Sequence, residues 1–463
     1  MFLSILQSLK FDKLKIFLVL YTVMMIQLKS SNKKELNTLG ITLFEDQIVR
    51  TLILTDNFDF LKLLSKKYQV VIFTNKSLGL FLEENLLRLK IDGIKIVRMN
   101  EIQESRIQKV LSFCLKWSDP SPATIRNLER EKASGRIYFF GILVRRIFYI
   151  LFSRLVFLKK IFRYFYYTLY SPSKVSSASL IQLPKLDALF ATALTNSESD
   201  LPLAIYYKKL STLVIGSLRS WDNLVTKGSL KFQPDLFFSH SEYMTRLARV
   251  IHGVKKNSLV SSVTPAYQKK FKPKNRRQSS TQIEVAYGCI GPVLNPDELN
   301  FISLLADLST EVKAHITVVQ HPKFMHQLDE INTGKLTFRK FEFLTTTLNE
   351  YYNFIAEQDF VIASGTSFAL DSLFVGTPLF NLAFEVIEQD FWLSHLRSFD
   401  SLPHSKYLFD KLMIKKISNK LELIQLLNGN IPWPSETYTE QDLQSITGDI
   451  NTNFNAQIFN LLD

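Results

Sequence analysis

The chain has 463 residues, 46% of them hydrophobic, and a formal net charge of +13 from 56 basic and 43 acidic residues. This length suits two domains better than one, and an apolar content that includes 37 phenylalanines excludes a disordered protein. The two cysteines, Cys114 and Cys289, are too few for a disulfide scaffold and favour a reducing compartment. The positive charge predicts an anionic partner, such as a membrane surface, a phosphorylated substrate or nucleic acid.

Residues 1–48 are predicted to form an N-terminal helical extension, with a helix over residues 14–28. Its apolar core, Ile16 to Ile26, is shorter than the roughly 20 residues that a membrane span requires. Three lysines, Lys10, Lys13 and Lys15, lie at its start. Two interpretations remain open: the helix packs on the protein, or it lies at the membrane surface with its lysines facing headgroups.

Short apolar runs and helical patterns alternate over residues 49–264, which predicts a first domain with a parallel sheet. Strands are expected at 50–55, 69–74, 94–98, 188–194, 211–215, 235–239 and 258–263.

Within this domain, residues 136–170 are predicted to form basic amphipathic helices. Apolar residues recur there at steps of three and four, which gives one stripe along a helix. The stripe consists of Phe148, Leu151, Leu155, Leu158, Phe162 and Phe165, and the surrounding cations include Arg145, Arg146, Arg154, Lys160 and Arg163. This pattern is typical of a helix on an anionic membrane, although the stripe can also belong to the domain core. No nucleic acid is expected, because no RNA-binding motif accompanies the charge.

Residues 265–282 are predicted to be a linker, followed by a second domain over 283–440 and a C-terminal helix over 441–463. Strands of the second domain are expected at 283–287, 315–319, 336–343, 360–363 and 378–382. Two such domains place a ligand cleft between the carboxyl ends of their sheets. The predicted fold class is therefore α/β, with two Rossmann-like domains facing a central cleft.

The segment DFVIASGTSFALDSLFVGTPLFNL, at 359–382, predicts a phosphate site. A buried strand ends at Gly365, which permits a tight turn, and Thr366 or Ser367 can cap the helix that follows. The free N–H groups and the dipole of that helix favour a diphosphate. Asp371, one turn further on, has a carboxylate that can accept hydrogen bonds from ribose hydroxyls.

This segment resembles the nucleotide-sugar half of GT-B glycosyltransferases. The sequence VVQHP, at 318–322, resembles an element of CDP-glycerol glycerophosphotransferase-like proteins, and YGCIGPVLNPDE, at 287–298, resembles the loop after the first strand of that domain. The resemblance implies a donor site made of Gly288, Gly291, His321, Gly365, Thr366, Ser367 and Asp371.

A second resemblance lies in the first domain, where SWDNLVTKG, at 220–228, precedes PDLFFSHSEYMTRLARVIHG and VTPAY. This order is similar to that of bacterial surface-carbohydrate transferases. Asp222 follows a strand end at the cleft edge, so it is the expected catalytic base for an acceptor hydroxyl. Contacts to the acceptor or to phosphate are expected from Trp221, Asn223, Lys227 and Glu242. The alternative is that Asp222 and Asn223 only form a turn, with Glu242 or Asp56 as the base.

The predicted function is a metal-independent GT-B glycosyltransferase without cofactors, in a superfamily shared with UDP-GlcNAc 2-epimerase-like enzymes. It is expected to move a sugar from a nucleotide-sugar donor to a lipid-linked or surface-polysaccharide acceptor. The expected location is the cytoplasm, peripheral on the inner face of the cytoplasmic membrane. The alternatives are a hydrolysing UDP-GlcNAc 2-epimerase-like enzyme and a non-catalytic membrane-associated scaffold. The scaffold is favoured by Gln320, where relatives commonly carry Arg, and by Asp371, where they commonly carry Glu.

Overall fold

The computed structural model describes the chain from residue 37 onward, with short gaps. The described residues are 37–117, 121–135, 139–152, 155–170, 175, 177–178, 182–195, 199–263, 265–267, 282–291, 294–323, 333–432, 440–449 and 454–462. The helix expected at 14–28, Arg154 and most of the expected linker lie outside these residues.

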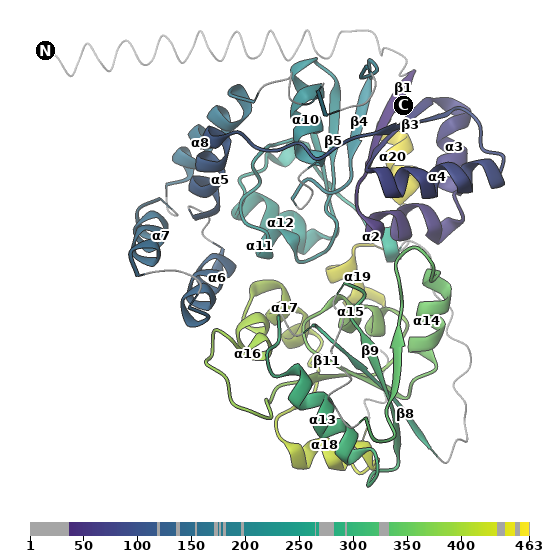
Figure 1. Cartoon of the computed structure of the whole chain (residues 1–463), viewed down its shortest axis with the longest axis vertical. Helices are drawn as coiled ribbons and strands as arrows, with labels where there is room; N and C mark the ends of the chain where they lie inside the picture. Colours follow the sequence, from purple (N-terminus) through teal and green to yellow (C-terminus); the bar gives the residue numbers. More distant parts are fainter. Residues whose placement is uncertain are drawn as a thin grey trace, which may run out of the picture.

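The first domain contains a seven-stranded parallel sheet in the order β3-β2-β1-β4-β5-β6-β7 (Figure 1). Its strands are β1 (Thr38–Leu43), β2 (Gln69–Thr74), β3 (Ile94–Arg98), β4 (Ala188–Ala191), β5 (Leu213–Gly216), β6 (Leu236–Ser239) and β7 (Leu259–Ser261). The helices between them include α3 (Asp59–Lys67), α4 (Lys76–Arg88), α10 (Asp200–Lys209), α11 (Asn223–Thr226) and α12 (Glu242–Val250). Every residue of β4 is buried, as expected for a central parallel strand with helices on both faces.

The second domain has a six-stranded parallel sheet in the order β10-β9-β8-β11-β12-β13. Its strands are β8 (Ile283–Gly288), β9 (Ala314–Gln320), β10 (Thr337–Lys340), β11 (Phe360–Ala363), β12 (Leu379–Leu382) and β13 (Lys416–Ile417). Its helices include α13 (Glu298–Leu308), α14 (Leu348–Ala356), α15 (Ser367–Phe374), α16 (His395–Asp400), α17 (Pro403–Lys411) and α18 (Lys420–Leu427). In both sheets the strand order reverses beside the first strand, which is the Rossmann pattern. The predicted class, α/β with two Rossmann-like domains, is confirmed.

The strand predicted at 50–55 is wrong. These residues lie in a π-helix (Val49–Ile53) and a 3-10 helix (Leu54–Asp56), after a short helix α2 (Asp46–Ile48). The first strand is instead β1, within the range predicted as extension. A short apolar run fits a buried helix as well as a buried strand, so periodicity alone does not separate them.

The C-terminal residues form two helices, α19 (Glu440–Thr447) and α20 (Phe454–Leu462), and return to the first domain. The ring of Phe454 lies 6.2 Å from that of Phe190 in β4 and 5.4 Å from that of Phe238 in β6. Between the helices, Gly448 has a φ of +87°, and a Cβ there would lie 2.2 Å from the carbonyl oxygen of Ser262. Only glycine fits this crossing.

Four helices form a layer on one side of the first domain (Figure 1). They are α5 (Arg106–Trp117), α6 (Pro122–Ala133), α7 (Phe139–Phe152) and α8 (Val156–Thr168). Because α7 and α8 are separate helices, the predicted stripe is not continuous. Phe148 packs on Phe113 of α5, with ring centroids 5.8 Å apart, and Phe162 packs against the core of the domain. Within this layer Arg145 pairs with Glu131.

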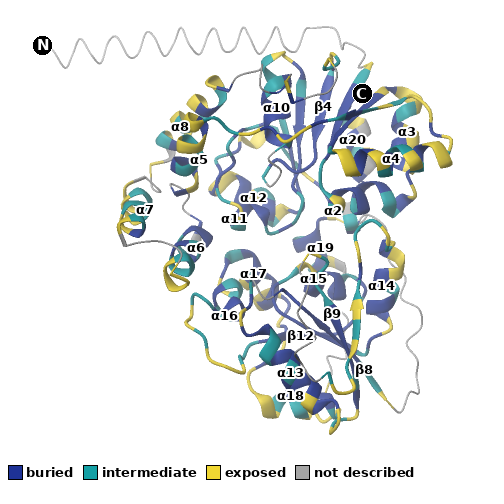
Figure 2. Cartoon of the chain, in the orientation of Figure 1, coloured by how far each residue is buried: buried dark blue, intermediate teal, exposed yellow. Residues whose placement is uncertain are grey.

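Large apolar side chains are exposed on α7 and α8, and two of them, Leu151 and Phe165, belong to the predicted stripe. Figure 2 shows both helices with many exposed residues. We call these apolar side chains the apolar face; it consists of Phe140, Leu143, Ile147, Ile150, Leu151, Phe157, Ile161, Tyr164 and Phe165. In the described part of the chain, each helix is too short or too polar to cross a bilayer.

Candidate active site

A cavity of about 450 Å³ lies between the two domains, at the carboxyl ends of both sheets. We call it the cleft. The first domain lines it with Gln47, Arg50, Lys227 and residues 219–223. The second domain lines it with residues 288–290, 319–323, 365–368, and with Leu294, Phe341, Phe343, Tyr351, Asp371, His395 and Phe399. The two sequence segments that carry the resemblances therefore meet in one cavity.

The turn from β11 to α15 faces the cleft as predicted, but with one correction. Thr366 occupies the N-cap position and Ser367, the first helical residue, is exposed. The N–H of Gly365, expected to be open to a diphosphate, donates to Oδ1 of Asp400 at 3.3 Å. A Cβ on Gly365 would lie 2.7 Å from Oγ of Ser405, so this glycine is required for packing as well. Donors for an anion are thus expected from the first turn of α15 rather than from Gly365.

Asp371 lies deep in the cleft, on α15, and its carboxylate is bound by two tyrosines. The hydroxyls of Tyr267 and Tyr351 each donate to one of its oxygens at 2.7 Å. Burial raises the pKa of Asp371, while both hydrogen bonds and the nearby Arg50 partly offset that rise. Each carboxylate oxygen can still accept a further hydrogen bond. The predicted hydrogen bond from a ribose hydroxyl to Asp371 therefore stays a prediction.

Of the other residues predicted to bind the sugar donor, two line the cleft and one holds a loop beside it. Gly288 lines the cleft, and a Cβ there would lie 2.2 Å from the ring of Phe368. Gly291 does not line the cleft; its N–H donates to Glu298 at 2.6 Å, which fixes the loop after β8. His321 lines the cleft, and its Nδ1 accepts from the N–H of Lys323 at 3.1 Å.

On the first-domain side, Trp221 and Asp222 line the cleft next to α17 of the second domain. The Trp221 ring contacts the imidazole of His404 at 4.8 Å. Oδ1 of Asp222 accepts from Nδ2 of Asn223 at 3.1 Å, and Oδ2 accepts from the Thr226 hydroxyl at 2.7 Å. Burial opposes the charged form of Asp222, but His404, the hydroxyls of Ser220 and Thr226, and then Lys227 outweigh it and lower its pKa. The carboxylate is therefore ionised at neutral pH.

The remaining predicted contacts differ in position. Asn223 is buried and its Oδ1 accepts from the N–H of Ser220 at 3.1 Å, so it also shapes the turn. Lys227 is exposed and lines the cleft. Glu242 is exposed at the first residue of α12 and does not line the cleft.

Arg50 and His395 are two of the cleft residues that the sequence analysis did not predict. Arg50 is buried in the π-helix, with its guanidinium 4.6 Å from the ring centroid of Phe343, and its position was hidden by the strand predicted there. His395 is 3% exposed, and neither ring nitrogen has a hydrogen-bond partner among the described residues. Burial, then Arg126 and Arg130, hold the pKa of His395 well below its usual value, so the ring is neutral. No pattern in the sequence distinguishes this histidine.

The cleft lining is more basic than acidic, with the cations Arg50, Arg219, Lys227 and Lys323 against the acids Asp222 and Asp371. Glu45 accepts from Arg219 at 2.7 Å and from Lys323 at 3.4 Å. No group of three His, Cys, Asp or Glu side chains within the described residues has a geometry that could hold a metal ion. The cleft thus presents cations, one helix N-terminus and the ionised carboxylate of Asp222, which suits an anionic ligand with a reacting hydroxyl.

The sequence matches no family model and no curated protein. Solved structures with a similar fold include the UDP-GlcNAc 2-epimerase from Methanocaldococcus jannaschii, at 12% identity and a TM-score of 0.45 over 92% of this chain and 99% of that one. A glycosyltransferase from Rickettsia africae has 9% identity and a TM-score of 0.41 over 93% and 94% of the chains. The UDP complex of MnaA from S. aureus has 9% identity and a TM-score of 0.46 over 92% and 95%. At these identities the likeness concerns the fold alone.

Proposed function

We propose that this chain is a GT-B glycosyltransferase that moves a sugar from a nucleotide-sugar donor to a lipid-linked or surface-polysaccharide acceptor. The observation that carries the proposal is the meeting of two distant segments in one cleft. Residues 219–223 line it from the first domain, and residues 365–368 with Asp371 line it from the second. Each segment was assigned to one substrate from its own pattern, and among the described residues the two segments meet in the cleft, where both substrates could react.

The groups that line the cleft near α15 support donor binding on the second domain. The first turn of α15 offers N–H groups to a diphosphate, and Arg50 of the first domain and Lys323 of the second add positive charge to the lining. Among the similar structures, one holds UDP and another is an enzyme that acts on UDP-GlcNAc. We infer that a nucleoside diphosphate is the part of the donor recognised here.

The proposed reaction places Asp222 as the base. Its ionised carboxylate takes the proton from an acceptor hydroxyl while the hydroxyl oxygen bonds to the anomeric carbon of the donor sugar. The bond from that carbon to the diphosphate breaks, and the nucleoside diphosphate leaves with the electron pair. The helix N-terminus and the cations of the cleft stabilise the charge on the leaving group, so the proposed steps need no metal.

A peripheral location on the inner face of the cytoplasmic membrane is part of the proposal. The apolar face on α7 and α8 supports it, because large exposed side chains such as Phe140 (74% exposed), Ile150 (68%) and Phe157 (56%) are rarely gathered on a surface without a partner. The exposed Lys160 is on the same helix as Phe157 and can meet lipid phosphate. The acceptor and the anionic membrane surface are therefore proposed to lie on one side of the molecule.

The test is a binding screen followed by an activity assay. UDP, GDP, CDP and CMP and their sugars are compared for the rise in melting temperature that each causes. A nucleotide that raises it supplies the donor for a transfer assay with membrane lipid extract as the acceptor source. Transfer of label to lipid supports the proposal. Release of free sugar and UDP from UDP-GlcNAc without an acceptor would indicate the epimerase-like alternative, and a failure of all nucleotides to bind would indicate a non-catalytic scaffold.

A further inference from the structure

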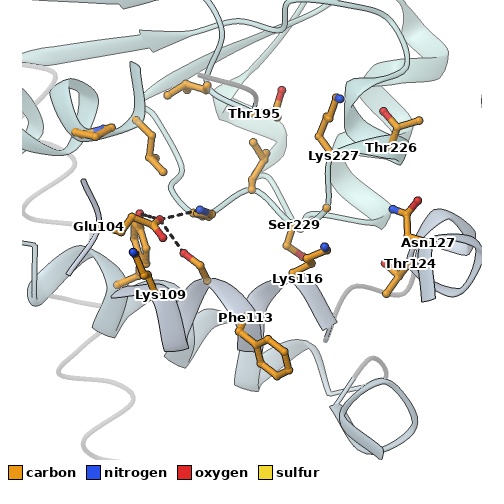
Figure 3. Close-up of a pocket in the computed structure, with 18 of the residues that line it drawn as sticks. Glu104, Lys109, Phe113, Lys116, Thr124, Asn127, Thr195, Thr226, Lys227 and Ser229 are labelled. Carbon is orange, nitrogen blue, oxygen red and sulfur yellow. Dashed lines mark hydrogen bonds and ion pairs between the residues drawn. The ribbon is translucent and has the colours of Figure 1, made fainter. Parts of the chain in front are cut away.

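A second cavity, of about 750 Å³, lies within the first domain and shares one lining residue, Lys227, with the cleft (Figure 3). We call it the polar pocket. Helix α5 forms one side with Lys109 and Lys116, and Figure 3 shows Thr226 and Lys227 on the opposite side. The ring of Phe113, also on α5, points away from the pocket toward α7. The end of the SWDNLVTKG segment lines this cavity with residues 225–228, which include the predicted contact Lys227, whereas the part formed by α5 has no signature in the sequence analysis.

The pocket carries an excess of positive charge. Four lysines line it, together with two acids, Glu101 and Glu104. Oε1 of Glu104 accepts three hydrogen bonds: from Lys231 at 2.8 Å, from the Tyr166 hydroxyl at 2.6 Å and from the Ser112 hydroxyl at 2.8 Å. Burial opposes its charge, but these bonds prevail and lower the pKa of Glu104, so it neutralises Lys231.

The other three lysines have weaker ion pairs with acidic side chains than Lys231 has, or none among the described residues. Lys116 has an ion pair of 3.9 Å with Glu131, and its Nζ lies 4.9 Å from the centroid of the Trp117 ring. Among the described residues, Lys109 and Lys227 have no acidic oxygen within ion-pair distance, and both are exposed toward solvent. Three cations with one exposed acid, Glu101, around one cavity favour an anionic ligand.

Polar groups without charge also line the pocket. Ser229 is 8% exposed, and its Oγ has no hydrogen-bond partner among the described residues. Thr124 and Asn127 of α6 add a hydroxyl and an amide. A buried hydroxyl without a partner is costly, and a ligand oxygen would satisfy it. This set of donors matches a ligand that bears both phosphate and sugar hydroxyl oxygens.

The polar pocket and the cleft adjoin at α11. Lys227 lines both cavities, and Thr226, which lines the pocket, donates to the carboxylate of Asp222, which lines the cleft. On its other side the pocket is bounded by α5 and by Tyr166 of α8, the helix that carries part of the apolar face. A ligand here lies between the proposed base and the proposed membrane contact.

We propose that the polar pocket binds the phosphate-bearing part of the acceptor, a sugar linked to a phosphate ester. This proposal rests on the proposed function, because the ligand is an acceptor only if the chain is a transferase. Phosphate binding in the pocket can be tested independently of that function. The phosphate would contact Lys109, Lys116 and Lys227, and a sugar hydroxyl would extend past Thr226 toward Asp222. The phosphate ester can come from a membrane lipid or from a soluble sugar phosphate, and the two sources share this chemistry.

Residue-specific acylation of lysine amines, read by peptide mass spectrometry on the full chain, tests the proposal. The probes are inorganic pyrophosphate, glucose 1-phosphate, and phosphatidylcholine vesicles with and without a polyprenyl phosphate. We expect phosphate-bearing probes to slow the labelling of Lys109 and Lys116 several-fold, while Lys66 and Lys76, which are exposed outside the pocket, label at an unchanged rate. Protection by glucose 1-phosphate identifies a soluble source, and protection only by the polyprenyl phosphate vesicles identifies a lipid source.

A pair of variants supplies the control. Lys109→Glu with Lys116→Glu should remove protection of Lys227, whereas Lys66→Glu with Lys76→Glu changes the net charge equally and should preserve it. Equal labelling of Lys109, Lys116 and Lys227 with every probe, or equal loss of protection in both double variants, would overturn the proposal. The donor screen is read separately: nucleotide binding without lysine protection rejects only the polar pocket, and lysine protection without nucleotide binding rejects only the proposed transferase.

Discussion

The hydroxyl of Thr226 donates a hydrogen bond of 2.7 Å to Oδ2 of Asp222, and this pair joins the two cavities of the molecule. Asp222 lines the cleft and Thr226 lines the polar pocket, with the single turn of α11 between them. The carboxylate is further held by Asn223, whose Nδ2 donates to Oδ1 at 3.1 Å. An acceptor in the polar pocket would therefore reach an oriented carboxylate without crossing the proposed donor site.

Replacing the carboxylate tests its role as the base. Asp222→Asn keeps the shape and the hydrogen bond from Thr226 but removes the basicity, so turnover should fall roughly 100-fold or more. Donor binding should change little, because the first turn of α15, Arg50 and Lys323 supply it. Initial rates of sugar transfer and calorimetric donor titration provide the two measurements.

Glu242→Gln is the matched control, because Glu242 is exposed on α12 and lines neither cavity. It should retain full turnover. Near-normal turnover in Asp222→Asn would reduce this residue to a turn former, and a large loss of donor affinity there would place it on the donor side.

Membrane binding is predicted to depend on the apolar face. Ile150→Asp with Phe157→Asp should weaken co-sedimentation with anionic vesicles by about 10-fold or more, because two exposed side chains no longer insert. Binding of the wild type should also fall with added salt, since each cation near the surface contributes about 1 kcal/mol.

The control for this effect uses apolar residues that are even more exposed but lie outside the apolar face. Leu87→Asp with Met413→Asp changes residues that are 80% and 87% exposed, on other elements. This variant should sediment like the wild type. If both double variants sediment equally, or if the wild type ignores anionic vesicles, the apolar face is not a membrane contact.

Asp400, which holds the amide of Gly365, predicts a pH dependence of stability. Burial raises the pKa of Asp400 to about 7, against hydrogen bonds from Asn381 and Gly365 and the charge of Lys416. Its unfolded pKa is about 3.9, so between these values only the folded state binds the proton. The stabilisation from Asp400 is thus complete below about pH 4 and is lost as the pH rises through about 7.

Asp400→Asn removes this titration, and Asn381, whose Oδ1 lacks a partner among the described residues, can rotate its amide to accept from the new side chain. Urea unfolding is measured at several values between about pH 5 and about pH 8. Relative to the wild type, the free energy of unfolding of the variant should rise by up to about 1.4 kcal/mol per pH unit. A constant difference between the two proteins across this range would mean that Asp400 is ionised throughout.

Much of the fold follows from local pattern. The strands β2, β3 and β11 and the helix α15 begin and end where the apolar runs and turn residues place them. Strand–helix alternation suffices for two parallel sheets because each helix must cover a sheet face. The strand predicted at residues 50–55 is wrong because a short apolar run, without a length or turn signal, fits a buried helix as well as a buried strand.

The site was predictable only in part, for a physical reason. Turns at strand ends are local features, so Asp222, Thr366, Ser367 and Asp371 could be placed at the cleft from sequence. Contacts between domains are not local: the bond from Arg126 of α6 to Ser398, at 2.8 Å, and the packing of His404 on Trp221 have no signature in either segment. The same holds for the amide of Gly365, whose acceptor, Asp400, lies 35 residues further along the chain.

We propose that the cleft binds a nucleoside diphosphate at the N-terminus of α15. This binding is tested by calorimetric titration of UDP, GDP and CDP against the wild type and Ser367→Glu. Ser367 is exposed at the first helical position, so a glutamate there favours the helix while it repels a phosphate. We expect one nucleotide to bind the wild type and the Ser367→Ala control, and to bind Ser367→Glu at least about 10-fold more weakly, with the melting temperature of the variant unchanged or raised. Equal affinity of Ser367→Glu and wild type for that nucleotide would contradict the account.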